Sequence, residues 1–244
     1  ERNLLTDNGF EVAVDDHLIV SPDGTPVRVR GLHANDKGAE RAVQGQRCAL
    51  NLTGAGARHE GVARGRWLVG ADGHAPTQRF DATIRVLGAY ERALAHWTPV
   101  HLHLGTQDVT ARVATLEGEE IGCGDRGLVR ITTDRPIAAW VGGRFILRDQ
   151  SARRTLAGGI VLDALPPQRG RAHNERLHYL RQVDVVAPAQ ALAALGTMRR
   201  SGVTVDEFAR GWNLTPDVCA GLLEEAQLDV IGSGVSRLAM DRTH

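Results

Sequence analysis

The sequence predicts a mainly β protein with an α/β C-terminal part, and two observations lead to this fold class. Up to about residue 167, short apolar or alternating runs recur with Gly, Pro and Asp between them, which is typical of antiparallel sandwiches or barrels. Beyond that point the apolar spacing changes from a period of about 2 to about 3.6, which indicates helices. A chain of 244 residues has room for about one to three domains with their own cores.

The β-rich part divides naturally near residue 77. About 150 residues are more than one small barrel needs and are enough for two. The polar, turn-rich A-D-G-H-A-P at 71–76 precedes a clear strand at 80–89, which favours the division. S-P-D-G at 21–24 predicts a turn, because Pro fixes φ and Gly tolerates a positive φ. The predicted strands cover residues 17–20, 26–32, 47–52, 66–69, 81–87, 100–104, 111–116, 128–132, 144–147 and 160–165.

The C-terminal part begins after a Pro-rich, basic linker, P-P-Q-R-G-R at 166–171, which cannot continue a β-ladder. Thr204 and Glu207 form a predicted capping box, and Thr215 with Pro216 predicts a second helix start. Two short helices joined by G-W-N-L at 211–214, then a hairpin at 229–240 with its tip at 232–234, predict a small winged-helix domain. The expected inward faces are Leu177, Leu180 and Val183, then Leu192, Leu195 and Met198, then Val218, Leu222 and Leu223.

Charge and cysteine content exclude several function classes. The 29 basic residues balance 29 acidic ones, which argues against a polycationic nucleic-acid binder. Lys37 is the one lysine among these 29 residues, and no G-x-x-x-x-G-K-[ST] motif surrounds it, so P-loop hydrolysis of a nucleoside triphosphate is excluded. Three widely spaced cysteines, no membrane-span-length apolar run and no signal peptide predict a cytoplasmic protein.

No motif predicts an enzyme or a metal site. His101 and His103 share one face of a predicted strand and could supply half of a metal site, but an ordinary strand explains them better. G-A-G-A-R-H at 54–59 lacks the third glycine of a dinucleotide motif and is interpreted as a loop. The adjacent acidic pairs at 15–16 and 119–120 point apart on a strand, which is poor geometry for acid–base catalysis.

The arginines are the better candidates for a binding role. Arg28 and Arg30 share one face of a strand, Arg47 follows G-Q, and further arginines cluster at 148–154 and in the linker. A planar, permanently charged guanidinium suits phosphate or another anion. On these residues alone, a solvated or salt-bridged face is the somewhat better interpretation.

Three motifs carry a resemblance to a known family. V-R-V-R-G-L-H-A-N-D at 27–36, continuing to G-Q-R-C-A-L-N-L at 45–52, resembles the second domain of the bacterial selenocysteine-specific elongation factors, the SelB family. G-T-Q-D-V-T-A-R-V at 105–113 resembles a third-domain strand of EF-Tu-like factors. R-F-I-L-R-D-Q-S-A-R-R-T-L-A-G-G at 144–159 is similar to a SelB segment that likewise precedes two prolines and a basic linker. The resemblance covers about residues 11–240, in the family's order.

The resemblance implies that the chain binds an aminoacyl-tRNA. The family delivers selenocysteinyl-tRNA to the ribosome at recoded UGA codons. It places the selenocysteine pocket at Arg47, with Gln46 and Gly45, where a buried guanidinium would distinguish an anionic selenol from the neutral hydroxyl of serine. The residues implied to contact the tRNA acceptor and T stems are Thr110, Arg112, Arg148, Arg153, Arg154 and Thr155.

The resemblance also implies a domain organisation. Residues 1–77 are expected to form an EF-Tu-type second domain short of strands, residues 78–167 a third domain, and residues 168–244 a linker and the first winged helix. GTP and Mg²⁺ would belong to a GTP-binding domain that this sequence lacks, so no catalytic residue, cofactor or metal is expected here. The implied partners are the tRNA, the ribosome and a selenoprotein mRNA hairpin held by later winged helices, with the chain a monomer.

Two other interpretations stay open. A winged-helix DNA-binding regulator with a β-rich sensor domain needs a basic recognition helix. The candidate at 216–227 carries Asp217, Glu224 and Glu225 and no basic residue, which disfavours it. A different EF-Tu-like factor would be favoured if no winged helix followed the second barrel.

Overall fold

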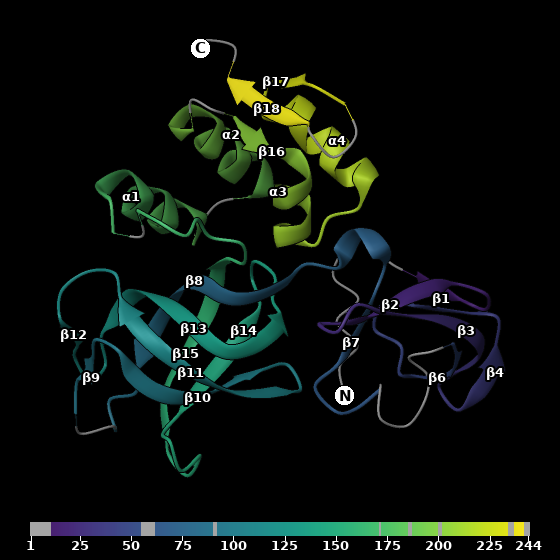
Figure 1. Ribbon diagram of the computed structural model, residues 1–244, viewed down its shortest axis with the longest axis horizontal. Helices are drawn as coiled ribbons and strands as arrows, with labels where there is room; N and C mark the ends of the chain where they lie inside the picture. The colour runs from purple at the N-terminus through teal and green to yellow at the C-terminus, as the bar shows by residue number, and fades with distance from the viewer. Residues whose placement is uncertain are drawn as a thin grey trace. The chain divides into compact units, whose positions relative to one another are not determined.

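The fold was determined as a computed structural model, which describes residues 11–54, 62–89, 92–170, 172–184, 187–199, 202–233 and 237–241. The chain divides into two compact units, Glu1–Pro76 and Thr77–His244. Over the described residues the protein is mainly β, with a closed barrel of six strands and four α-helices (Figure 1). The predicted fold class is confirmed at this level. The loop predicted at 54–59 and the wing tip at 232–234 lie partly outside the described residues.

The first unit is built from short antiparallel strands around a small apolar core. β6 pairs with β3 in a sheet of order β4-β3-β2-β7, while β1 pairs with β5. The elements are β1 (Glu11–Ala13), β2 (His17–Ser21), β3 (Thr25–Ala34), β4 (Lys37–Ala39), β5 (Arg41–Val43), β6 (Cys48–Thr53), β7 (Trp67–Val69) and the 3₁₀ turn η2 (Ala71–Gly73). The buried core residues are Val12, Leu18, Val20, Val27, Val29, Leu32 and Ala42.

Two turns fix the register of the first unit. The turn predicted at 21–24 joins β2 to β3, and Gly24 takes a φ of 79° there. Asn35 and Asp36 both have positive φ, 51° and 65°, between β3 and β4. That pair of conformations matches the right-handed strand twist, and Asn and Asp tolerate it better than most residues.

The second unit contains the closed barrel, in the order β10-β11-β13-β8-β15-β14. Along most of these strands side chains alternate between the inside and the outside, and Phe80, Leu102, Ile131 and Leu147 are fully buried inside. Phe80 packs edge-to-face on Phe145, with 5.3 Å between ring centroids. The strands are β8 (Pro76–Val86), β10 (Thr98–Leu104), β11 (Gln107–Thr115), β13 (Arg126–Ala138), β14 (Arg144–Arg148) and β15 (Thr155–Asp163), with β9 (Leu94–Ala95) and β12 (Glu120–Ile121) forming a separate pair.

Gly159 in β15 is a point of close approach within the barrel. A Cβ built there would lie 2.5 Å from Phe145 Cζ and 2.5 Å from the Thr83 carbonyl oxygen. The neighbouring Gly158 has only the Phe145 carbonyl oxygen nearby, at 3.8 Å. We therefore expect Gly159→Ala to lower the free energy of unfolding by about 1–3 kcal/mol through overpacking. Gly158→Ala is the matched control, and urea unfolding curves that show equal losses for both variants would contradict this packing argument.

The helical segment that follows the barrel consists of four helices and a three-stranded sheet of order β16-β18-β17 (Figure 1). Its elements are α1 (Asn174–Val183), α2 (Pro188–Met198), β16 (Val203–Thr204), α3 (Val205–Trp212), α4 (Pro216–Glu225), β17 (Leu228–Ile231) and β18 (Leu238–Asp241). The helix starts predicted at Thr204 and Thr215 are confirmed. Asn213 ends α3 in the left-handed conformation, with a φ of 53°.

Two details predicted for the helices are wrong. The Thr204 side chain makes no capping hydrogen bond, because Thr204 lies in β16, paired with Leu238. Val218 was expected to face inward, but its exposed fraction is 37%, whereas the next residue, Cys219, is 3% exposed. The inward face of α4 therefore starts at Cys219, and burial raises the pKa of its thiol.

The barrel and the helical segment share one apolar core. Leu116, Leu128 and Leu162 of the barrel belong to the same buried cluster as Leu177 and Leu180 of α1. The linker at 166–170 forms neither helix nor strand, yet the Pro167 carbonyl accepts a hydrogen bond from Arg130 at 2.9 Å. The three-part division at residues 77 and 167 stays a prediction, while the structure groups the barrel and the helices in one compact unit.

Candidate RNA-binding face

Three of the predicted tRNA contacts lie in one row on the outer face of the barrel. The pairing register places Thr110 of β11 opposite His101 of β10, His101 opposite Arg148 of β14, and Arg148 opposite Thr155 of β15. We call these four residues the outer row. Because neighbouring strands lie about 4.8 Å apart, the row spans about 14 Å across four strands. Arg112 follows Thr110 by two residues on the same face of β11 and is exposed.

Hydrogen bonds hold three side chains of the outer row in place. The Thr110 hydroxyl donates to Asp134 Oδ2 at 2.5 Å, and His101 Nδ1 lies 3.2 Å from Asp108 Oδ1. Arg148 Nη1 donates to the Ala152 carbonyl at 3.2 Å. The face thus carries both basic and acidic groups, in a fixed arrangement rather than as a plain basic patch.

A tight loop at 149–154 presents two exposed arginines at the end of the row. The Asp149 carboxylate accepts hydrogen bonds from the backbone N–H of Arg153 at 2.8 Å, the N–H of Arg154 at 3.2 Å and the Ser151 hydroxyl at 3.0 Å. The hydrogen bond from the Arg154 backbone, helped by those from Arg153 and Ser151, holds the pKa of Asp149 below its ordinary value. The loop therefore fixes the backbone from which the Arg153 and Arg154 side chains project.

His101 was missed as a member of this face. The sequence pattern of His101 and His103 suggested only half of a metal site or an ordinary strand. In the structure both lie near Asp108, at 3.2 and 3.9 Å. Over the described residues no group of three His, Cys, Asp or Glu side chains could hold a metal ion. The two-residue spacing of His101 and His103 indicated that both lie on one face of a strand. The pairing of His101 with Arg148 of β14 could not be deduced from sequence.

The predicted selenocysteine pocket residues lie in a turn of the first unit. Gly45 has a φ of 82°, Gln46 Oε1 accepts from the Val43 N–H at 2.9 Å, and the Arg47 carbonyl accepts from the Asn35 N–H at 3.0 Å. Arg47 precedes β6 and its side chain is exposed. The expectation of a buried guanidinium is therefore wrong for this chain, while the role of Arg47 stays a prediction.

A hollow of about 760 Å³ lies beside the same strands but not at this turn. Its lining comes from β3, from β4 with the adjoining Glu40, and from β6, and it includes His33, Glu40 and Asn51. None of Gly45, Gln46 and Arg47 contributes to it. The described residues also offer no P-loop for GTP, and no described helix is long and apolar enough to cross a membrane.

Comparisons with solved structures define the class of fold. The chain is similar to a bacterial selenocysteine-specific elongation factor, EF-Sec, with a TM-score of 0.68 at 18% identity over 94% of this chain and 35% of that chain. It is also similar to Sup35 complexed with GDP, with a TM-score of 0.57 at 20% identity over 64% of this chain and 42% of that chain. These likenesses show that the chain shares its fold with parts of both proteins.

Sequence comparisons identify the relatives more closely. Residues 81–168 match the family model for the β-barrel domain of the selenocysteine-specific elongation factor. The factor of Escherichia coli K12 is 35% identical over 88% of this chain, and that of Haemophilus influenzae is 30% identical over 84%. Over most of its length the chain is thus similar to the selenocysteine-specific elongation factors of these two bacteria. It spans about a third of the length of these curated relatives, 33% and 32%.

Proposed function

We propose that this chain is an aminoacyl-tRNA-binding part of a selenocysteine-specific elongation factor, the protein that brings selenocysteinyl-tRNA to the ribosome. The observation that carries the proposal is the outer row together with Arg153 and Arg154, on the part of the barrel that matches the family model. The sequence resemblance and the named relatives support the assignment to selenocysteine rather than to another amino acid.

The chemistry of the outer face suits the backbone of an RNA stem. Arg148, Arg153 and Arg154 offer guanidinium donors that bind phosphate oxygens in a forked geometry. Thr155 adds a hydroxyl donor, and phosphate contacts of this kind fix the position of an RNA without reading its sequence. On the same face Asp108 lies within hydrogen-bond distance of His101, and Asp134 accepts from Thr110, which orients those two side chains.

In this proposal Arg47 contacts the aminoacyl group. Its exposed side chain is accessible to a ligand, and Gln46 stiffens the turn that presents it. A selenol is more acidic than a cysteine thiol and is largely an anion at neutral pH, whereas the serine hydroxyl is neutral. A permanently charged guanidinium therefore favours selenocysteine over serine.

The helical segment fits a winged helix in the same proposal. α3 and α4 joined at Asn213 form a helix-turn-helix, and the β16-β18-β17 sheet supplies the wing. Residues 1–77 and 78–167 would be the two EF-Tu-type barrels, and an mRNA hairpin and the ribosome would be partners of the complete factor. A DNA-binding regulator is disfavoured, because α4 carries Asp217, Glu224 and Glu225 and no basic residue.

Binding of this chain to selenocysteinyl-tRNA and seryl-tRNA, measured by filter binding, tests the proposal. We expect tighter binding of selenocysteinyl-tRNA, and we expect Arg47→Ala to reduce that preference at least about tenfold, as the loss of a charge-assisted contact would. Arg41→Ala is the matched control, because Arg41 is an exposed arginine of β5 that pairs with Glu11. Binding of neither tRNA, or equal losses for both ligands with Arg47→Ala, would contradict the proposal.

A further inference from the structure

A cluster of four charged side chains, three of them buried, joins α1 to the outside of the barrel. Asp81 of β8 is 0% exposed and lies between two arginines that are each 4% exposed. Arg130 of β13 donates to its Oδ1 at 2.6 Å and to its Oδ2 at 3.0 Å. Arg176 of α1 donates to Asp81 Oδ2 at 2.7 Å and to Asp163 Oδ2 of β15 at 2.6 Å.

We propose that this cluster, Asp81, Arg130, Asp163 and Arg176, is a rigid joint that makes the barrel and the helical segment one cooperative body. It connects residues 95 positions apart, because Arg176 reaches back to Asp81. The helical segment is then not a module on a free linker. Whatever it binds is held at a fixed place relative to the barrel.

The charges of the joint depend on one another. Two guanidinium groups face two carboxylates, so the formal charges cancel only while α1 is docked. Burial lowers the pKa of Arg176, but the attraction of Asp163 and Asp81 and their hydrogen bonds outweigh it, and the net shift is upward. Undocking α1 would separate Arg176 from both carboxylates and expose Asp81 and Arg130 to water, so the complete cluster exists only in the docked state.

Apolar packing and backbone contacts surround the joint. Leu116, Leu128 and Leu162 of the barrel lie in one buried cluster with residues of α1 and α2. The Val141 N–H, in the loop after β13, donates to the Gly211 carbonyl of α3 at 2.8 Å. The helical segment is therefore docked through α3 as well as α1, and not through the linker alone.

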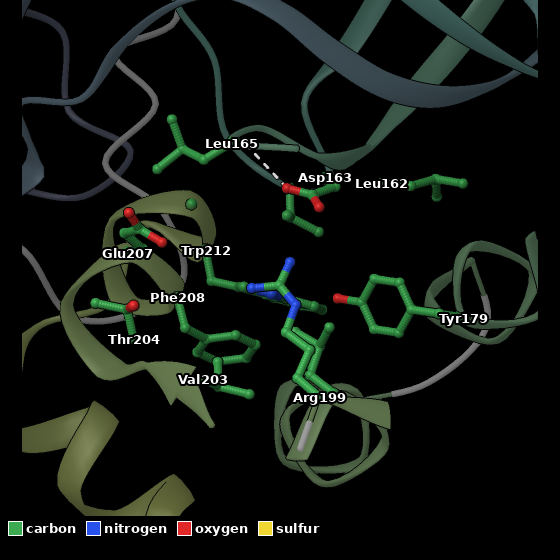
Figure 2. Close-up of a pocket in the computed structure, with 13 residues that line it drawn as sticks. Leu162, Asp163, Leu165, Tyr179, Arg199, Val203, Thr204, Glu207, Phe208 and Trp212 are labelled. Atoms are coloured by element: carbon green, nitrogen blue, oxygen red, sulfur yellow. Dashed lines mark hydrogen bonds between the residues drawn. The ribbon is translucent and has the colours of Figure 1, made fainter. Parts of the chain in front are cut away.

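A small cavity forms a second polar layer of the joint. Its volume is about 30 Å³, enough for about one or two water molecules. Figure 2 shows the Arg199 guanidinium pointing into it between the Tyr179 hydroxyl and Asp163. Burial and the nearby Asp163 raise the pKa of Tyr179, so its hydroxyl stays protonated and can donate. Asp163 thus faces both Arg176 and this cavity, and it links the two layers.

The joint has a geometric consequence for the outer row. β15 begins at Thr155 of the row and ends at Asp163 of the joint. Eight steps of about 3.3 Å separate these residues by about 26 Å along one rigid strand. The joint and the outer row therefore meet β15 at opposite ends, and the contacts of Arg176 in α1 go to Asp81 and Asp163 and not to the row.

Hydrogen exchange of the full chain, followed by mass spectrometry, tests the joint. In the wild-type protein we expect the slowest amides of α1 and of β8, β13 and β15 to exchange at similar rates, because one opening exposes both. Arg176→Gln should accelerate exchange in α1 and in these strands together, at least about tenfold. Arg181→Gln is the control, since Arg181 also joins α1 to the barrel, through an exposed pair with Glu117.

Two results would overturn the joint. The first is far faster exchange in helices α1 to α4 than in the barrel strands of the wild-type protein. This measurement does not depend on whether any variant folds. The other is an Arg176→Gln variant in which α1 loses protection while β8 and β13 keep theirs, or which behaves like Arg181→Gln.

Discussion

Asp81→Asn is expected to lower the free energy of unfolding by about 3–5 kcal/mol, among the largest effects of any single substitution in this chain. The substitution keeps the size of the side chain but removes the charge that Arg130 and Arg176 share. Arg176 then keeps Asp163, but Arg130 loses the carboxylate with which it pairs, and an uncompensated buried charge is costly because it cannot be solvated by water.

Urea unfolding followed by circular dichroism measures this effect on the whole unit. Asp206→Asn is the matched control, because Asp206 pairs with Arg237 at 3.0 Å in a partly exposed position. Such a pair contributes at most about 1 kcal/mol. A loss below about 1 kcal/mol for Asp81→Asn, or equal losses for both variants, would show that the buried cluster does not stabilise the unit.

Much of the strand pattern could be predicted from sequence, because inside and outside residues alternate along each barrel strand. The same alternation explains what was missed. Asp81 and Arg130 occupy outward positions of β8 and β13, where charged residues are ordinarily solvated. Their burial results from α1, whose Arg176 lies 95 positions after Asp81 in the chain. A local pattern carries no information on such a contact.

The candidate site was predictable to a similar extent. The motifs identified Thr110, Arg148 and Thr155, and the register then placed them in one row with His101. Arg47 shows the limit, since a motif gives the position of a residue but not its burial. The burial of Cys219 in place of Val218 could not be predicted either. In a short helix, an inward face shifted by one residue still fits the apolar spacing of the sequence.

The double variant Arg153→Ala/Arg154→Ala tests most directly the central claim that the outer face of the barrel binds the tRNA stems. Its control is Arg85→Ala/Arg126→Ala, which removes the same charge from exposed arginines of β8 and β13. The measurement is the dissociation constant for selenocysteinyl-tRNA as a function of salt concentration, with wild type and both variants in parallel.

Loss of two phosphate contacts should weaken binding at least about tenfold at low salt and reduce the slope of log K against log salt by about 1.4–1.8. The control should keep the wild-type slope and nearly the wild-type affinity. Equal weakening by both double variants would contradict the account, because it would mean that the tRNA responds to the overall charge of the barrel and not to this face.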